Sequence, residues 1–148
     1  SSFIFSPDDN MVAYTASGSA SLPDRLIKPL PGASTQAQDR NITPGKTYVY
    51  DIKEDRNFLI TDSPVTINNS DNPELSALRW MSSSRHLLLA NQNQIIIMDY
   101  DGTNRQTVYS GSYLMPYAFP FSNTSKILIL TNLGSSDSAS NLYTLSVK

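Results

Sequence analysis

The sequence predicts an all-β protein, and three observations support this prediction. Ser, Thr and Asn account for 45 of the 148 residues, and these side chains bond to nearby backbone groups in turns and extended segments. The apolar segments are short and rich in β-branched and aromatic residues, and Pro, Gly, Asn, Asp or Ser bound each of them. No apolar pattern keeps a spacing of 3.6 over the roughly ten residues that a helix needs. Only residues 22–30 have room for a helical turn, and their prolines argue against more.

The first four strands are expected at residues 3–5, 11–15, 47–52 and 58–61. The polar turn SPDDN separates FIF from MVAYT, and the turn KEDRN separates TYVYDI from FLIT. Each apolar run is rich in β-branched or aromatic residues, as in half-buried strands. Between the second and third strands lies an insertion, residues 18–46.

Seven further strands are expected after residue 76. The runs ALRWM, LLLA, QIIIMDY and TVY predict strands at 77–81, 87–90, 94–100 and 107–109, and Asp101-Gly102 is the strongest hairpin signal in the chain. The runs AFPF, ILILT and LYTLSV predict the last strands at 118–121, 127–131 and 142–147.

The strands recur as a repeat. The segment FSPDDNMVAYT (5–15) aligns without gaps on MSSSRHLLLAN (81–91) and on FSNTSKILILT (121–131). From Ser82 to Ser122 is 40 residues, which is the length of a four-stranded propeller blade. This predicts about 2.75 blades of a β-propeller built from four-stranded antiparallel meanders. Blade one spans 1–62 with the insertion 18–46, blade two spans 77–110, and blade three spans 117–148 without its last strand.

A closed propeller takes about four to eight blades. We therefore expect either further blades in a longer chain, or two copies of this chain that complete a ring of about six blades. The sequence begins at Ser1 and has no apolar leader, which favours a processed or excised piece.

These residues resemble the TolB-like, WD-type β-propeller repeat family. FSPDDNMVAY resembles that family's aromatic-Ser-Pro-Asp-Gly turn and the strand after it, and IMDYDG (97–102) resembles its Asp-Gly hairpin. The resemblance covers most of the chain outside 18–46. Asp9 stands where Gly is usual, and Ser83 and Asn123 replace Pro. The Pro-rich insertion is also similar to the propeller tails of bacterial envelope proteins that carry a PEGA domain, although this chain contains no PEGA domain.

Composition excludes several classes of function. The chain has no Cys, which excludes disulfide scaffolds, thiolate zinc sites and cysteine nucleophiles. Its 11 basic residues are scattered and the formal net charge is −2, so no positive stripe for nucleic acid is expected. Apolar runs of four or five residues are far too short for a membrane span.

The sequence favours a non-catalytic protein-interaction or scaffold module. The resemblance implies a bacterial cell-envelope protein outside the cytoplasm, which the absence of Cys and the Ser/Thr/Asn richness also favour. One alternative is a propeller that gates a prolyl-oligopeptidase-like hydrolase domain outside this chain. A second is a propeller that binds a sugar or small ligand.

The connections differ in length between the two ends of the strands. In a meander, alternate connections share one end. The turn end holds the short connections 7–10, 53–56, 83–85, 101–104 and 122–126. The loop end holds 18–46, 62–76, 110–116 and 133–141, with only 91–93 short. Because long loops often carry function, we expect the binding surface at the loop end.

The candidate binding residues are Asp24, Arg25, Lys28, Asp39, Arg40, Tyr113 and Tyr117. The first five lie on the insertion, which Pro23, Pro29, Pro31 and Pro44 stiffen, so that charged side chains can be presented at low entropic cost. The alternative is that the insertion caps the first blade and buries Leu22, Leu26, Ile27 and Leu30.

No catalytic residue, cofactor or metal site is predicted. Asp99 and Asp101 alternate as in a calcium loop, but the hairpin accounts for the same residues and position 108 is Val where the loop needs Glu. His86 is the only His and has no second His or Cys for a metal. Trp80 is expected in the core.

Overall fold

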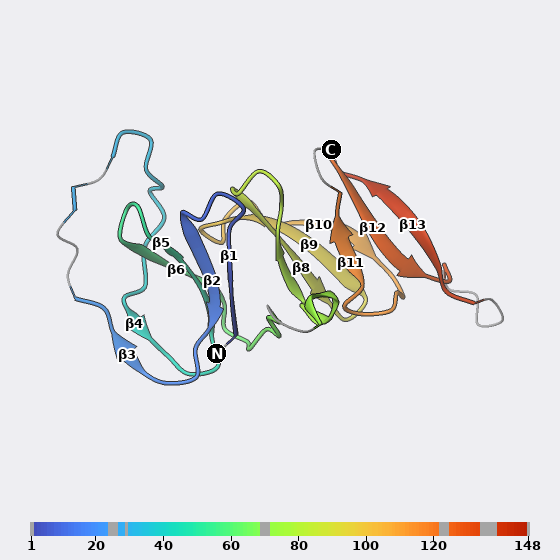
Figure 1. Cartoon of the computed structure of the whole chain (residues 1–148), viewed down its shortest axis with the longest axis horizontal. Coiled ribbons are helices and arrows are strands. Elements are labelled where there is room, and N and C mark those ends of the chain that lie inside the picture. The colour runs from blue at the N-terminus through green and yellow to red at the C-terminus, as the bar shows by residue number, and fades with distance from the viewer. Residues whose placement is uncertain are drawn as a thin grey trace.

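The structure is a computed structural model of the chain, and it describes residues 2–23, 27–28, 30–68, 72–121, 125–133 and 139–147. The described residues form thirteen strands and one turn of 3-10 helix, which confirms the all-β prediction. That helical turn lies at Pro73–Leu75, whereas the described part of 22–30 contains none. Three antiparallel sheets follow one another along the long axis of the molecule (Figure 1).

Sheet 1 is a four-stranded meander with an interruption. It contains β1 (Ser2–Phe5), β2 (Met11–Thr15), β5 (Thr47–Asp51) and β6 (Arg56–Thr61), hydrogen-bonded in that order. The insertion between β2 and β5 contributes its own two-stranded sheet, β3 (Ala20–Ser21) and β4 (Asn41–Ile42).

Sheets 2 and 3 are meanders without interruption. Sheet 2 contains β7 (Leu78–Trp80), β8 (His86–Asn91), β9 (Gln94–Asp99) and β10 (Gln106–Ser110). Sheet 3 contains three strands, β11 (Ala118–Pro120), β12 (Lys126–Thr131) and β13 (Asn141–Ser146). Each of the eleven strands expected from the sequence is therefore present within a residue or two of its expected bounds.

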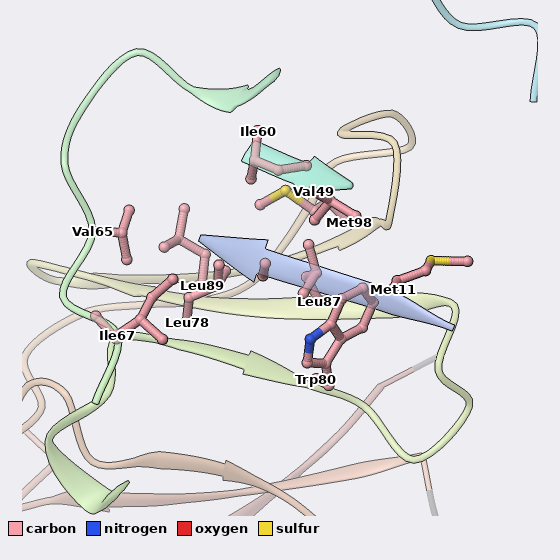
Figure 2. Close-up of a cluster of buried hydrophobic side chains, with 12 residues drawn as sticks. Met11, Val49, Ile60, Val65, Ile67, Leu78, Trp80, Leu87, Leu89 and Met98 are labelled. Carbon is pink, nitrogen blue, oxygen red and sulfur yellow. The ribbon is translucent and has the colours of Figure 1, made fainter. Parts of the chain in front are cut away.

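The sheets stack face to face and share two cores. The first core joins sheets 1 and 2, and Figure 2 shows Trp80 and Leu87 lying against Met11, with Val49, Ile60 and Met98 beside them. The second core joins sheets 2 and 3 through Leu88, Ala90, Ile95, Ile97, Ala118, Ile127 and Ile129. Sheet 2 is therefore covered on both faces, which explains why its strands read as nearly continuous apolar runs.

The structural repeat differs by one residue from the gap-free alignment that the sequence predicts. The first hairpin closes through a hydrogen bond from the Ser6 amide to the Met11 carbonyl, and the second through one from Met81 to His86. Ser6 therefore matches Met81 in space, whereas the sequence alignment places it on Ser82.

Turn geometry is the reason for this correction. Each of these two hairpins needs one residue in the left-handed region, and that residue is Asp9 in the first (φ 59°) and Ser84 in the second (φ 56°). Val12 and Leu87 each lie three residues after the left-handed residue of their hairpin, so they are equivalent. The third hairpin closes from Phe121 to Lys126, 40 residues after the second, which makes Ile127 equivalent to Leu87. With that correction, Leu87 and Leu89 of sheet 2, which face sheet 1, are equivalent to Ile127 and Ile129 of sheet 3, which face sheet 2.

The insertion covers part of the outer face of sheet 1. Tyr48 on β5 and Ile42 on β4 form a third, small core with Ala16, against which Leu22 and Leu59 pack. The covered residues of the sheet are mainly those of its last two strands. Phe3 and Phe5 on β1 stay exposed on the same face.

Candidate functional site

The insertion runs from the loop end of sheet 1 to its turn end and back. It leaves β2 at Ala16, pairs β3 with β4 at the loop end, and carries residues 34–40 alongside β6, the edge strand (Figure 1). We call residues 34–40 the strap. The expectation that the whole insertion belongs to the loop end is corrected here, because its middle part reaches the turn end.

Backbone and amide contacts hold the strap on β6. The Asp39 amide donates to the Asn57 carbonyl at 2.8 Å, and the Asn57 side-chain amide donates to the Asp39 carbonyl at 2.7 Å. Asn57 is fully buried, and its Oδ1 accepts a hydrogen bond from the Tyr14 hydroxyl at 2.9 Å. Burial of that hydroxyl raises the pKa of Tyr14 to about 12. The start of the edge strand is therefore covered rather than open to pairing with another strand.

The guanidinium of Arg40 fastens the strap to the turn between β5 and β6. It donates to the Asp55 carbonyl at 2.9 Å and forms an ion pair with the Asp55 carboxylate at 3.1 Å. It also donates to the Pro23 carbonyl and to the Gln38 side chain, each at 2.8 Å. The Arg40 guanidinium therefore binds groups of its own chain.

The start of the strap bridges sheets 1 and 2 at the turn end. The Ser34 hydroxyl donates to the Asp101 carboxylate at 2.5 Å, and Arg56 donates to the carbonyls of Ser34 and Gln36. Burial alone would raise the pKa of Asp101, but the hydrogen bonds from Ser34 and Thr103 outweigh it and lower that pKa. The Asp101-Gly102 hairpin of sheet 2 is thus part of the strap's anchor.

Residues 27, 28 and 30, which precede the strap, are presented to solvent. Ile27 is 45% exposed and Leu30 42% exposed, and Lys28 between them is exposed as well. Leu30 lines a small cavity together with turn residues of sheets 1 and 2, namely Asp8, Asn10, Lys53, Glu54 and Arg85. We call this group, with Ile27 and Lys28, the tip surface. It combines apolar side chains with charges of both signs.

The structure separates the candidate binding residues that the sequence predicts. Asp24 and Arg25 lie outside the described residues, as does Leu26. Lys28 belongs to the tip surface, whereas Asp39 and Arg40 make internal contacts in the strap. Of the apolar residues expected under a cap, Leu22 packs on sheet 1, but Ile27 and Leu30 do not.

The two candidate tyrosines lie at the loop end, far along the chain from the strap. Tyr113 is buried in the second core, and its hydroxyl donates to the Asn91 carbonyl at 2.6 Å. Burial raises its pKa to about 12. Tyr117 is partly exposed and lies 6.3 Å from Phe119, ring centre to ring centre. Tyr113 therefore has a packing role. The two tyrosines do not form one aromatic surface for a ligand.

Sequence reasoning missed a hydrogen-bonded chain of Ser83, His86 and Asp99. His86 Nδ1 lies 2.9 Å from the Ser83 hydroxyl, and Nε2 lies 3.3 Å from the Asp99 carboxylate. The feature that could have revealed this contact is the hairpin of β8 with β9, whose pairing puts His86 opposite Asp99. Ser83 and His86 are both exposed, and the Ser83 hydroxyl also accepts the Arg85 amide within its turn. These contacts join the turn before β8 to the end of β9.

No group of three or more metal-ligating side chains forms among the described residues. The Asp101 carboxylate accepts a hydrogen bond from the Thr103 hydroxyl within its own hairpin turn and another from Ser34 of the strap. Within the same part of the chain, no helix has the length and apolar character needed to cross a membrane.

A scan against protein-family models finds no family that matches the sequence, and a search of curated proteins finds no match.

Proposed function

We propose that this chain is a non-catalytic segment of a β-propeller, which serves as a protein-interaction scaffold of a bacterial cell-envelope protein. The observation that supports this proposal most directly is the tip surface, where the apolar side chains of Ile27 and Leu30 are exposed just before the anchored strap. The uniform stacking of three antiparallel meanders, with the same positions facing each neighbour, supports the propeller arrangement. The repeat resemblance supports the location outside the cytoplasm.

The anchors make the tip surface suitable for recognition. The Leu30 carbonyl accepts a hydrogen bond from the Ala33 amide, and the Ser34 hydroxyl is bonded to Asp101. The part of the tip surface next to the strap therefore loses little conformational entropy when a partner docks, so more of the contact energy remains as affinity. Ile27 and Leu30 supply apolar contact, while Lys28, Lys53 and Arg85 supply charges that can orient a partner. This combination is typical of sites for other proteins rather than for small molecules.

The non-catalytic part of the proposal rests on the chemistry of the polar groups. Ser83 and His86 are exposed, and Asp99 at the end of β9 is partly buried. The Asp101 carboxylate accepts hydrogen bonds from the Ser34 and Thr103 hydroxyls, and the Asp55 carboxylate pairs with Arg40. A gating role for a hydrolase domain would place the chemistry outside this chain.

A site-specific crosslinking experiment tests the proposal. A photo-crosslinking amino acid at position 30 is expected to capture discrete proteins from an envelope fraction of the source cells, and few from their cytosol. Excess unmodified chain should compete with this capture at least about tenfold better than a Lys28→Glu/Leu30→Asp double variant, because the variant loses both the apolar contact and the charge.

The matched control carries the same crosslinker at Leu75, which is 42% exposed but lies outside the tip surface. Capture of the same proteins from position 75, or equal competition by the double variant, would contradict the proposal.

A further inference from the structure

The cavity of the tip surface is small and carries charged groups from two sheets. It is lined by turn residues of sheets 1 and 2 and by Leu30, and its volume is about 90 Å³. Pockets for small-molecule ligands usually have a volume of about 300–1,000 Å³. The cavity therefore suits one side chain of a larger partner rather than a complete small molecule.

Arg85 presents a positive charge to this cavity from the turn before β8. Its carbonyl accepts a hydrogen bond from the Tyr100 amide at 2.9 Å, and its guanidinium carbon lies over the Tyr100 ring, 5.6 Å from the ring centre. A guanidinium that lies over an aromatic ring keeps the N–H groups of its edge available to acceptors. No described residue forms a hydrogen bond or an ion pair with the Arg85 side chain. These N–H groups can therefore donate to a group of a partner.

Lys53 supplies a second cation to the same cavity from the turn between β5 and β6. Its side chain is exposed, and no carboxylate in the described part of the chain pairs with it. The cations Arg40 and Lys46 of the same half of the molecule are paired, with Asp55 and Asp62 respectively. An ammonium and a guanidinium that line one cavity favour an anionic group, and a carboxylate can accept hydrogen bonds from both.

The carboxylates that line the cavity are mostly bonded within their own turns. Asp8 accepts hydrogen bonds from the Ser6 hydroxyl at 2.6 Å and from the Asn10 amide at 3.2 Å. Asp51 is 4% exposed and accepts the Glu54 amide at 2.9 Å. Glu54 is partly exposed, and it is the one lining carboxylate to which the described residues donate no hydrogen bond. Two unpaired cations thus accompany one unpaired carboxylate, so the groups still able to bind a partner are positive on balance.

We propose that the partner of the tip surface inserts one acidic side chain, Asp or Glu, into the cavity lined by Lys53 and Arg85, and packs a neighbouring apolar side chain on Leu30. The two cations bind the carboxylate, and Leu30, which is 42% exposed, supplies the apolar contact beside it. The partner is therefore a protein with a short acidic and aliphatic segment. This inference rests on the proposed docking role of the tip surface and adds the chemistry of the partner.

Selection from a phage-displayed library of short random peptides tests this chemistry. Peptides are selected on the immobilised chain, and those that also bind the Leu30→Asp chain are removed. Relative to the unselected library, the remaining peptides should be enriched in Asp or Glu beside Leu, Ile, Val or Met. Failure to select any peptide, or enrichment in Lys and Arg, would overturn the proposal.

Single charge changes then test where the acidic residue binds. Fluorescence anisotropy of a selected peptide should show binding at least about tenfold weaker in Arg85→Gln, because charged hydrogen bonds to the carboxylate are lost. Glu54→Gln should strengthen binding, because it removes the unpaired carboxylate of the cavity. Lys126→Gln is the matched control and should leave binding unchanged, because Lys126 is an exposed cation at the turn end of sheet 3, outside the tip surface.

A charge exchange tests the contact directly. The Arg85→Glu chain should lose the selected peptide, and it should bind the version with Lys in place of the acidic residue at least about tenfold better than the wild-type chain does. Far-UV circular dichroism checks that each variant is folded. Unchanged binding in Arg85→Gln, or no gain in the charge exchange, would overturn the proposal. If the selected peptides still required Leu30, the docking role of the tip surface would stand and only the acidic partner would be wrong.

Discussion

At the scale of single residues, the first hairpin depends on one carboxylate. Asp8 accepts hydrogen bonds from the Ser6 hydroxyl at 2.6 Å and from the Asn10 amide at 3.2 Å. These bonds, that from Ser6 first, lower the pKa of Asp8 from 3.8 to about 2. The Ser6 hydroxyl in turn accepts the Met11 amide at 3.0 Å, and the Asp8 amide donates to Ser84 of the next sheet. One ionised group thus orders the turn that sets the register of β1 and β2.

This depressed pKa predicts a dependence of stability on pH. The ionised form is favoured in the folded state, so its contribution is present above pH 3.8 and is lost as the pH falls towards 2. The free energy of unfolding should decrease over this range, and Asp8→Asn should make that decrease shallower. Urea denaturation at several pH values measures both.

The control for this experiment is Asp9→Asn in the same turn. Asp9 is exposed, and Asn tolerates its positive φ of 59°, so the variant reports the change in net charge alone. If the two variants flatten the pH profile equally, Asp8 has no special role.

At the scale of elements, the strap changes what the edge of sheet 1 can do. An uncovered β6 would offer a row of unpaired backbone groups to other chains. The strap lies on the start of that edge, where Arg40 binds Asp55 and Asp39 binds Asn57. The strap itself contains no strand. Its contacts with β6 and with the turn before β6 come from side chains and from isolated backbone hydrogen bonds.

Removal of the Arg40 side chain should loosen the strap. The guanidinium is largely buried, with 14% of the side chain exposed, and it makes four hydrogen bonds. Arg40→Ala is therefore expected to cost about 1–3 kcal/mol of stability, because the charged bonds are lost and Asp55 keeps a partly buried carboxylate. Hydrogen exchange should show faster exchange at the Asp39 amide.

Lys28→Ala is the matched control, because Lys28 is a cation of the same insertion and its side chain is exposed. A loss of stability in Lys28→Ala equal to that in Arg40→Ala would show that the strap is not held by this side chain.

At the scale of the whole molecule, the two cores make the sheets interdependent. Sheet 2 contributes one face to each core, through Leu87 on one side and Leu88 on the other. Loss of packing between sheets 2 and 3 therefore exposes a face of the sheet that also supports sheet 1. We expect the three sheets to unfold as one cooperative unit.

The variant Ile129→Ala tests this cooperativity. Ile129 is fully buried between sheets 2 and 3, and its truncation should cost about 2–5 kcal/mol. Trp80, the chain's only Trp, lies in the other core and reports unfolding there by fluorescence. Its transition should shift together with the transition measured by circular dichroism.

Leu75→Ala, at an exposed position, should shift neither signal by more than about 0.5 kcal/mol. Separate transitions for fluorescence and circular dichroism in Ile129→Ala would mean that the sheets unfold independently.

Local patterns were enough to predict the strands of the three sheets. The run Ile95-Ile96-Ile97-Met98, for example, is β-branched and bounded by turn residues, which is typical of a strand covered on both faces, and β9 is such a strand. The strands β3 and β4 were missed because each has two residues and they are nineteen residues apart. Their pairing is accompanied by the packing of Ile42 and Leu22 on Tyr48, which no local pattern announces.

The candidate site was less predictable than the fold. Charge and proline content pointed to the insertion, but they could not separate Lys28, which is exposed, from Arg40, which is bonded internally. That difference depends on where Asp55 and Asn57 lie, and they belong to a turn and a strand that follow the insertion in sequence. The long-range contact between Ser34 and Asp101 has no counterpart in any local signal.

The sequence by itself determined the all-β class, the order of the strands and the recurrence of the hairpins, because these follow from short-range alternation and from turn residues. Tertiary structure alone decided the one-residue offset of the first unit, the path of the insertion to the turn end, and the choice of which apolar faces stay exposed. The physical reason is that each of these depends on hydrogen bonds and packing between residues far apart in the chain, such as Asn57 with Asp39, Ser34 with Asp101 and Trp80 with Ile4.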